Sequence, residues 1–161
     1  HTLNAHLYVA TGMVGGSGPN VNEGAGNSMP FELIAAPFID SRVLSDAMNA
    51  MGLPGVRFRP IVFRPNRGQF ARKMLGGAQI LLDDPRAFRP LRTALAFLVN
   101  LQRLYPEELT VKDWRRFGRV WGNDEILRMI RQGLTVEQIE ASWAAELDEF
   151  GKKRAKYLIY E

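Results

Sequence analysis

Apolar residues alternate with polar ones in two stretches of the first half of the chain, and this pattern predicts strands. From Leu3 to Ala10 the apolar residues fall at every second position, as in a half-buried strand. From Val56 to Phe63 apolar residues alternate with arginines as far as Pro60, which favours an edge strand or a bulge at the proline. A third strand is expected at Gly77–Leu82, before an Asp-Asp-Pro turn. These strands predict a small sheet.

Helical periodicity dominates the second half. An earlier helix is expected between an N-cap at Asp40 and a stop at Gly52 and Pro54. Later helices are predicted at Leu91–Leu104, Asp113–Trp121, Glu125–Gln132 and from the capping-box pattern of Thr135 and Gln138 onward, the last burying Ile139, Trp143, Leu147 and Phe150. Tyr157–Tyr160 is expected to close the sheet. The predicted class is α+β in one domain, 1–161, with helices on a small mixed sheet and a helical C-terminal half.

A glycine-rich stretch from Thr11 to Pro30 contains few apolar residues and is predicted to be a loop. Structureless segments of this length are uncommon inside compact domains and often carry function. The stretch fails the phosphate-binding pattern GxxxxGK[ST] and the dinucleotide pattern GxGxxG. Nucleotide binding is therefore not expected.

Composition excludes several classes of function. The 161 residues are 46% hydrophobic and 24% charged, as in globular domains, and no apolar run approaches the roughly 18 residues of a membrane helix. There is no cysteine, and the only histidines are His1 and His6, so neither a thiolate nor a histidine-rich metal site is expected. The net charge of +4 fits an anionic polymer as partner, or simply a solvated basic surface.

After nucleotide and metal sites are excluded, the remaining candidate chemistry is that of carboxylates. Glu23 lies within the glycine-rich stretch and Glu32 follows it. Glycosidases place two carboxyl groups beside the scissile bond, and glycines let the backbone approach a sugar closely. Either glutamate also fits a plain structural reading, Glu23 as a solvated loop residue and Glu32 as part of the turn after Pro30. The three tryptophans fit sugar stacking, although their helical spacing favours core packing.

The blocks around these residues resemble the exo-β-N-acetylmuramidase family (NamZ/YbbC-like peptidoglycan glycoside hydrolases). The resemblance rests on Asn20-x-x-Glu23-Gly24-x-Gly26, Pro30-Phe31-Glu32-Leu33-Ile34, Pro54-Gly55-Val56-x-Phe58-Arg59-Pro60, Gly77-Ala78-Gln79, Leu104-Tyr105-Pro106 and Arg154-x-x-Tyr157-Leu158-x-Tyr160. It covers essentially the whole chain. The loop diverges from the family pattern, with Ser17 in place of a glutamate and Ala25 in place of an arginine.

The resemblance implies a C-terminal domain whose N-terminal Rossmann-like companion is absent from this chain, with an active cleft between the two. The implied activity is exo-acting removal of N-acetylmuramic acid from peptidoglycan fragments in the bacterial cell envelope, periplasmic or extracellular, without metal or organic cofactor. Glu23 is the candidate catalytic carboxylate. The candidate substrate-binding residues are Asn20, Glu32, Arg57 and Arg59, either arginine being suited to the lactyl carboxylate of muramic acid.

Other functions stay open. The divergent loop makes enzymatic activity uncertain and allows a catalytically degenerate envelope domain that binds glycan or partner proteins. A basic nucleic-acid binder is disfavoured, because the arginines are scattered and no basic block is interleaved with aromatic residues.

Overall fold

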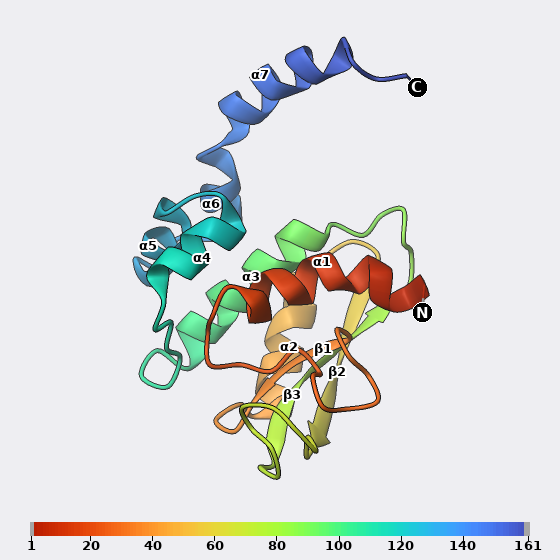
Figure 1. The fold of residues 1–161 in the computed structure, drawn as a ribbon, viewed down its shortest axis with the longest axis vertical. Coiled ribbons are helices and arrows are strands. Elements are labelled where there is room, and N and C mark those ends of the chain that lie inside the picture. The colour runs from red at the N-terminus through yellow and green to blue at the C-terminus, as the bar shows by residue number, and fades with distance from the viewer. Residues whose placement is uncertain (1, 160–161) are drawn as a thin grey trace.

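A computed structural model describes residues 2–159, and Figure 1 shows a small sheet at one end and helices at the other. The elements, in chain order, are α1 (Thr2–Gly16), β1 (Leu33–Ala36), α2 (Ser41–Ala50), β2 (Val56–Phe63), β3 (Leu75–Leu82), α3 (Pro90–Leu104), α4 (Trp114–Trp121), α5 (Glu125–Arg131), α6 (Val136–Ala141) and α7 (Ala144–Ala155). The predicted α+β class with a helical C-terminal half is confirmed. Among the described residues no helix is long and apolar enough to cross a membrane.

The three strands form a sheet in the order β1-β3-β2, and both pairings are antiparallel rather than mixed. Ile34, Phe58 and Ile80 lie on the face that packs against the helices. Leu33 and Leu75 lie on the opposite face, where the side chain of Phe70 covers them. The first face is therefore covered by helices, and the second is covered by loop residues around Leu33 and Leu75 but is exposed at the arginines of β2.

The main core lies between the sheet and the first three helices. α2 begins at the predicted N-cap, where the Asp40 carboxylate accepts hydrogen bonds from the backbone N–H groups of Arg42 and Val43 at 2.9 and 3.1 Å. α3 is buried along most of its length, and the Phe97 ring meets the Phe58 ring edge to face at 5.5 Å. This core fixes the sheet against the helices and so holds the loops that emerge from both.

The predicted strand at Leu3–Ala10 is wrong, because this segment belongs to α1. The same apolar residues fit two periodicities, the two-residue spacing of a strand and the spacing of a helix. Leu7, Ala10 and Val14 recur at helical spacing and are fully buried, whereas Val9, which the strand pattern would bury, is 47% exposed. The helix runs to Gly16, so the glycine-rich loop begins six residues later than predicted.

The C-terminal region departs from prediction at its end. The capping box of Thr135 and Gln138 is confirmed, but the predicted single helix is divided into α6 and α7. Ile139 is buried and Trp143 is half-buried, whereas Leu147 and Phe150 are both 60% exposed. Figure 1 shows α7 standing away from the rest of the fold. The predicted burial is therefore wrong for Leu147 and Phe150, which belong to a helix that extends away from the core.

Two further predictions, a closing strand and the core packing of the tryptophans, concern the same half of the chain. Residues 157–159 form no strand, and Tyr160 lies outside the described residues. Trp121 is 8% exposed and stacks on Phe117 in the core, as predicted, whereas Trp114 is 58% exposed and lies beside the Arg115 guanidinium. Core packing therefore describes Trp121 but is wrong for Trp114.

Replacing Leu147 by alanine is expected to change the free energy of unfolding of this chain by no more than about 0.5 kcal/mol, as for exposed sites in general. The reason is that the side chain is 60% exposed and already in contact with water. Urea unfolding followed by circular dichroism measures the difference. A loss well above 1 kcal/mol would show that α7 folds back onto the protein in solution.

Candidate functional site

The glycine-rich loop, residues 17–32, is fastened to α1 at its far end. The Asn4 side chain donates to the backbone oxygen of Pro30 at 2.8 Å, and the Thr11 hydroxyl donates to that of Phe31 at 2.9 Å. The Tyr8 ring meets the Phe31 ring edge to face at 4.8 Å. These contacts hold the loop over one face of α1, close to the sheet edge formed by β1.

Glu23 stands where the loop touches both β1 and α1. The preceding residue, Asn22, exchanges two backbone hydrogen bonds with Ala35 of β1, at 2.7 and 2.9 Å, and so extends the sheet by one bridge. The half-buried Glu23 side chain lies on α1 at Gly15, where a Cβ would come within 2.8 Å of the carboxyl carbon. Only glycine at position 15 leaves room for this placement.

The Glu23 carboxylate is not engaged by the protein. Within residues 2–159 it has no hydrogen-bond or ion-pair partner, although its backbone oxygen accepts from the Phe31 N–H at 2.7 Å. The backbone of Glu23 is thus fixed, and its acidic group has no polar partner among the described residues. An unpaired carboxylate is available for proton exchange with a bound molecule.

Asn20 has a structural use in this fold. Its side-chain amide donates to the backbone oxygen of Glu108 at 2.8 Å and accepts from the Thr110 N–H at 2.8 Å. The Asn20 N–H also donates to the Thr110 oxygen. These hydrogen bonds hold the start of the loop against the segment between α3 and α4. The role of Asn20 in substrate binding stays a prediction. A substrate would have to bind Asn20 while these hydrogen bonds are kept.

Glu32 and Arg59 are brought together through a residue that sequence reasoning did not select. Gln79 is 5% exposed in the central strand β3; its amide nitrogen donates to the Glu32 carboxylate at 3.1 Å, and its oxygen accepts from the Arg59 Nε at 2.7 Å. The register places Gln79 between Leu33 and Arg59 across the sheet. The sequence signal that could have identified Gln79 is that it is a single side-chain amide in an otherwise apolar strand.

Arg57 lies on the same sheet face but has a different partner. Its guanidinium donates two hydrogen bonds to the Asp83 carboxylate, at 2.6 and 2.8 Å, in a bidentate pair. Hydrogen bonding to Arg57 lowers the pKa of Asp83 below its ordinary value, and the same bond raises the pKa of Arg57. The side chains are 68% and 42% exposed, so the pair is a surface one.

Replacing Arg57 by glutamine is expected to raise the pKa of Asp83 back toward its ordinary value. The charged pair stabilises the fold above the ordinary pKa of an aspartate and loses this effect as the pH falls through the lowered pKa of the folded protein. Carbon-detected NMR titration of the Asp83 carboxyl group measures the shift. Arg119→Gln, on the exposed side of α4, is the control and should leave the Asp83 titration where it was.

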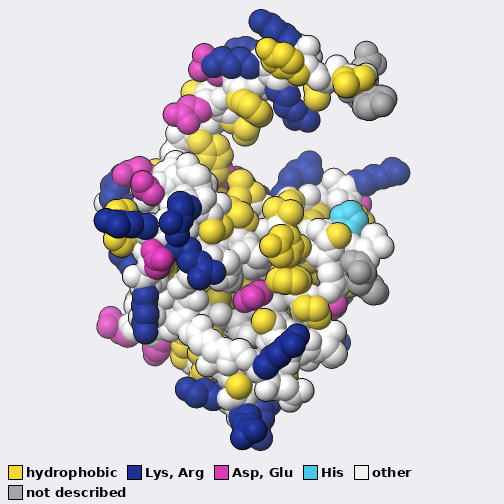
Figure 2. Space-filling view, viewed as in Figure 1, with side chains coloured by type: hydrophobic (Ala, Val, Ile, Leu, Met, Phe, Trp, Pro, Cys, Tyr) yellow, Lys and Arg dark blue, Asp and Glu magenta, His cyan; other side chains and the backbone are white. Residues whose placement is uncertain are grey.

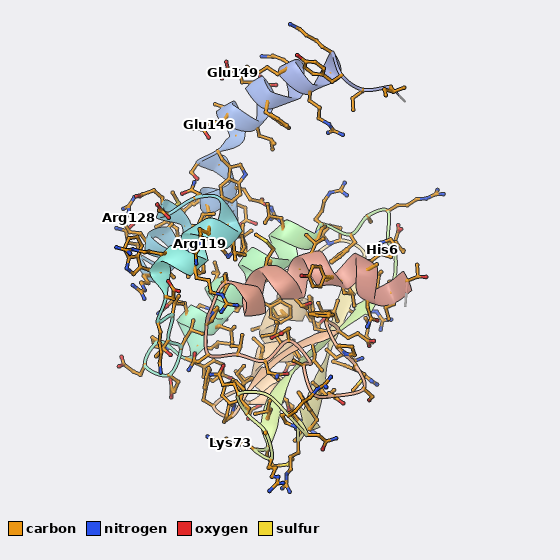
Figure 3. The ribbon with its side chains drawn as sticks, viewed as in Figure 1. His6, Lys73, Arg119, Arg128, Glu146 and Glu149 are labelled. Atoms are coloured by element: carbon orange, nitrogen blue, oxygen red, sulfur yellow. The ribbon has the colours of Figure 1, made fainter. Side chains whose placement is uncertain are left out.

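The described part of the chain contains no group of three or more histidine, cysteine, aspartate or glutamate residues able to hold a metal ion. His6, labelled in Figure 3, lies exposed on α1 instead of in a strand. The predicted site residues thus fall into four places: Asn20 at the segment between α3 and α4, Glu23 against α1, Glu32 with Arg59 on the sheet, and Arg57 nearer the start of β2.

Comparison with known proteins places this arrangement in a family. Residues 6–160 match the family model described as "Exo-beta-N-acetylmuramidase NamZ, C-terminal". The chain is 38% identical over 154 residues to the peptidoglycan beta-N-acetylmuramidase NamZ of Bacillus subtilis (strain 168); the match covers 96% of this chain and 37% of the relative. The chain therefore spans well under half of that protein.

Two crystal structures of DUF1343 family proteins from Bacteroides fragilis NCTC 9343 share the fold. One has a TM-score of 0.89 at 26% identity and covers 100% of this chain and 43% of that chain. The other has a TM-score of 0.68 at 19% identity, covers 100% of this chain and 42% of that chain, and supports the fold alone. Since the family model matches nearly every residue, the chain belongs to the exo-β-N-acetylmuramidase NamZ family and corresponds to its C-terminal domain.

Proposed function

We propose that this chain is the C-terminal domain of an exo-acting peptidoglycan glycoside hydrolase that removes N-acetylmuramic acid from the non-reducing ends of glycan fragments. The observation that carries the proposal is the 38% identity, over 96% of the chain, to a peptidoglycan beta-N-acetylmuramidase. The free Glu23 carboxylate on a glycine-rich loop supports it, because hydrolysis of a glycosidic bond needs a positioned acid or base.

Glu23 has the central role in this proposal, which is to exchange a proton with the glycosidic oxygen or with the attacking water. The Glu32–Gln79–Arg59 network has a binding or supporting role: each polar group fixes the next, so the network presents its outer atoms to the sugar in one arrangement. No cofactor takes part in this chemistry.

The proposal includes a companion domain. The chain spans 37% of the Bacillus subtilis relative and 43% of one Bacteroides fragilis structure, so those proteins contain a large further region. We propose that an N-terminal Rossmann-like domain supplies the other wall of the cleft. We also propose that the whole protein acts in the bacterial cell envelope, periplasmic or extracellular, because the proposed substrate is a fragment of the cell wall.

The test is release of N-acetylmuramic acid from a chromogenic β-muramide by the full-length protein. The expected result is turnover above the buffer rate with N-acetylmuramic acid as product, and no turnover of the matching β-glucosaminide. Absence of any product from the muramide at high enzyme concentration would remove the catalytic proposal.

A second candidate is a non-catalytic envelope domain that binds glycan or a partner protein. The observation that favours it is Ser17, which stands where the family resemblance expects a glutamate. The Ser17 side chain is fully buried and its hydroxyl donates to the Val14 oxygen at 2.9 Å, so position 17 supplies no acid. Calorimetric binding of a muropeptide by the full-length protein without hydrolysis would support this candidate over the first.

A further inference from the structure

The glycine-rich loop forms one wall of a polar hollow whose other wall is the loop between β2 and β3. The hollow has a volume of about 490 Å³ and is lined by Gly26, Asn27, Ser28, Arg64, Asn66 and Arg67. Cavities of this size accommodate small ligands. The lining offers amide, hydroxyl and guanidinium groups and contains no acidic or large apolar side chain.

The two walls are joined by their backbones. The Asn66 N–H donates to the Gly26 oxygen at 3.0 Å, and the Arg72 N–H closes the second loop by donating to the Pro65 oxygen at 2.8 Å. Gly26 has a φ of 81°, and a Cβ there would come within 3.1 Å of the Arg67 nitrogen. The contact therefore requires glycine, and it fixes the backbone that carries both arginines.

The charged residues that line the hollow, Arg64 and Arg67, are both cationic. The segment 57–73 contains six cationic residues, namely Arg57, Arg59, Arg64, Arg67, Arg72 and Lys73, and no acidic one. Lys and Arg side chains gather at the sheet end of the molecule in Figure 2, the end at which Figure 3 labels Lys73. A concave surface surrounded by cations attracts anions, and a guanidinium pairs with a carboxylate through two parallel hydrogen bonds.

The arginines of this segment differ in how far they are already engaged. The Nε and Nη2 atoms of Arg57 donate to Asp83, and the Nε of Arg59 donates to Gln79. Arg64 and Arg67 are exposed, and across residues 2–159 neither takes part in an ion pair or a side-chain hydrogen bond. They are the arginines beside the loop with the most free donors.

We infer that Arg64 and Arg67 form a carboxylate-binding subsite that recognises the acidic group of a muramic-acid-containing glycan. The inference rests on the proposed function and adds the part that separates muramic acid from N-acetylglucosamine, which lacks the lactyl carboxylate. Gly26 follows Glu23 by three residues, a span of at most roughly 10 Å along the chain. The subsite and the candidate catalytic carboxylate therefore belong to the same loop.

The carboxylate has two possible sources, and NMR titration of the 161-residue chain separates them. The probes are N-acetylmuramic acid, with a free lactyl carboxylate, muramyl dipeptide, in which that group is amidated and the acid lies on the peptide, and N-acetylglucosamine as the uncharged control. Binding is expected to shift the backbone amide signals of residues 26–28, 64, 66 and 67. The double variant Arg64→Gln/Arg67→Gln is expected to weaken binding of the acidic probe roughly ten- to a hundredfold.

Arg86→Gln is the matched control, since Arg86 is an exposed arginine in the loop after β3, at the opposite end of the strand from the hollow. Equal affinity of the double variant and the native chain for both acidic probes would overturn the subsite and leave the proposed function intact. Loss of muramyl dipeptide binding alone would assign the subsite to the peptide acid. If the native chain binds neither acidic probe, the subsite is refuted, whatever the turnover assay shows.

Discussion

Replacing Glu23 by glutamine is expected to lower the turnover of a chromogenic muramide by roughly 10²–10⁴-fold, the range that a positioned proton-transfer group contributes. Glutamine keeps the size of the side chain and its place against Gly15 but cannot exchange the proton. The carboxylate forms no hydrogen bond or ion pair with residues 2–159, so its loss leaves no buried partner unsatisfied. The expected effect is therefore on kcat with little change in the unfolding midpoint.

Glu107→Gln is the matched control for charge, because Glu107 is exposed in the turn that follows α3. Its turnover should equal that of the native protein. Full activity of the Glu23→Gln protein would remove Glu23 from the chemistry and leave the family membership unaffected. A lower kcat accompanied by a clearly lower unfolding midpoint would show that Glu23 supports the loop and does not act on the substrate.

The features that sequence predicted well depend on local chemistry. The Asp40 carboxylate caps α2, and Thr135 and Gln138 satisfy each other's backbone donors at the start of α6. Such caps involve residues two or three positions apart, and no distant part of the fold is needed to form them. The starts of both helices were accordingly placed correctly, whereas the end of α6 was not.

The failures all depend on what packs against a segment. α1 carries both a two-residue and a helical apolar period, and only the buried partners decide between them. β1 was missed because it has no alternation: Leu33 and Ile34 are both fully buried, one on each side of the sheet, since both faces are covered at this strand. Leu147 and Phe150 form the expected stripe on α7, yet a stripe does not reveal whether its partner is present.

The candidate site shows the same division. Glu23 lies on a glycine-rich loop, as predicted, and its catalytic role stays a prediction; its position against Gly15 follows from the helix that replaced the predicted strand. The link between Glu32 and Arg59 requires the register of three strands, which no local pattern contains. Gln79 could have been suspected as a polar residue in an apolar strand, because a buried amide needs partners.

Replacing Gly24 by alanine is expected to destabilise the chain more than replacing Gly122 by alanine. Both glycines have a left-handed backbone, with φ of 90° and 66°. This conformation costs a residue with a Cβ about 1–2 kcal/mol. At Gly122 a Cβ would meet nothing within 4 Å, so that cost is the whole effect. At Gly24 a Cβ would also collide with the Met29 oxygen and come within 3.1 Å of the Pro30 Cα.

The added collision has a functional consequence, because the turn at Gly24 determines where Glu23 points. The Gly24 N–H donates to the Asn22 side-chain oxygen at 2.8 Å, and the Gly24 oxygen accepts from the Asn27 N–H at 3.1 Å. Relief of the collision must move this turn and with it the neighbouring carboxylate. Urea unfolding should rank Gly24→Ala below Gly122→Ala, and the muramide assay should show lost turnover only for Gly24→Ala. Equal stability and full activity in both variants would mean that the loop adopts another conformation in solution.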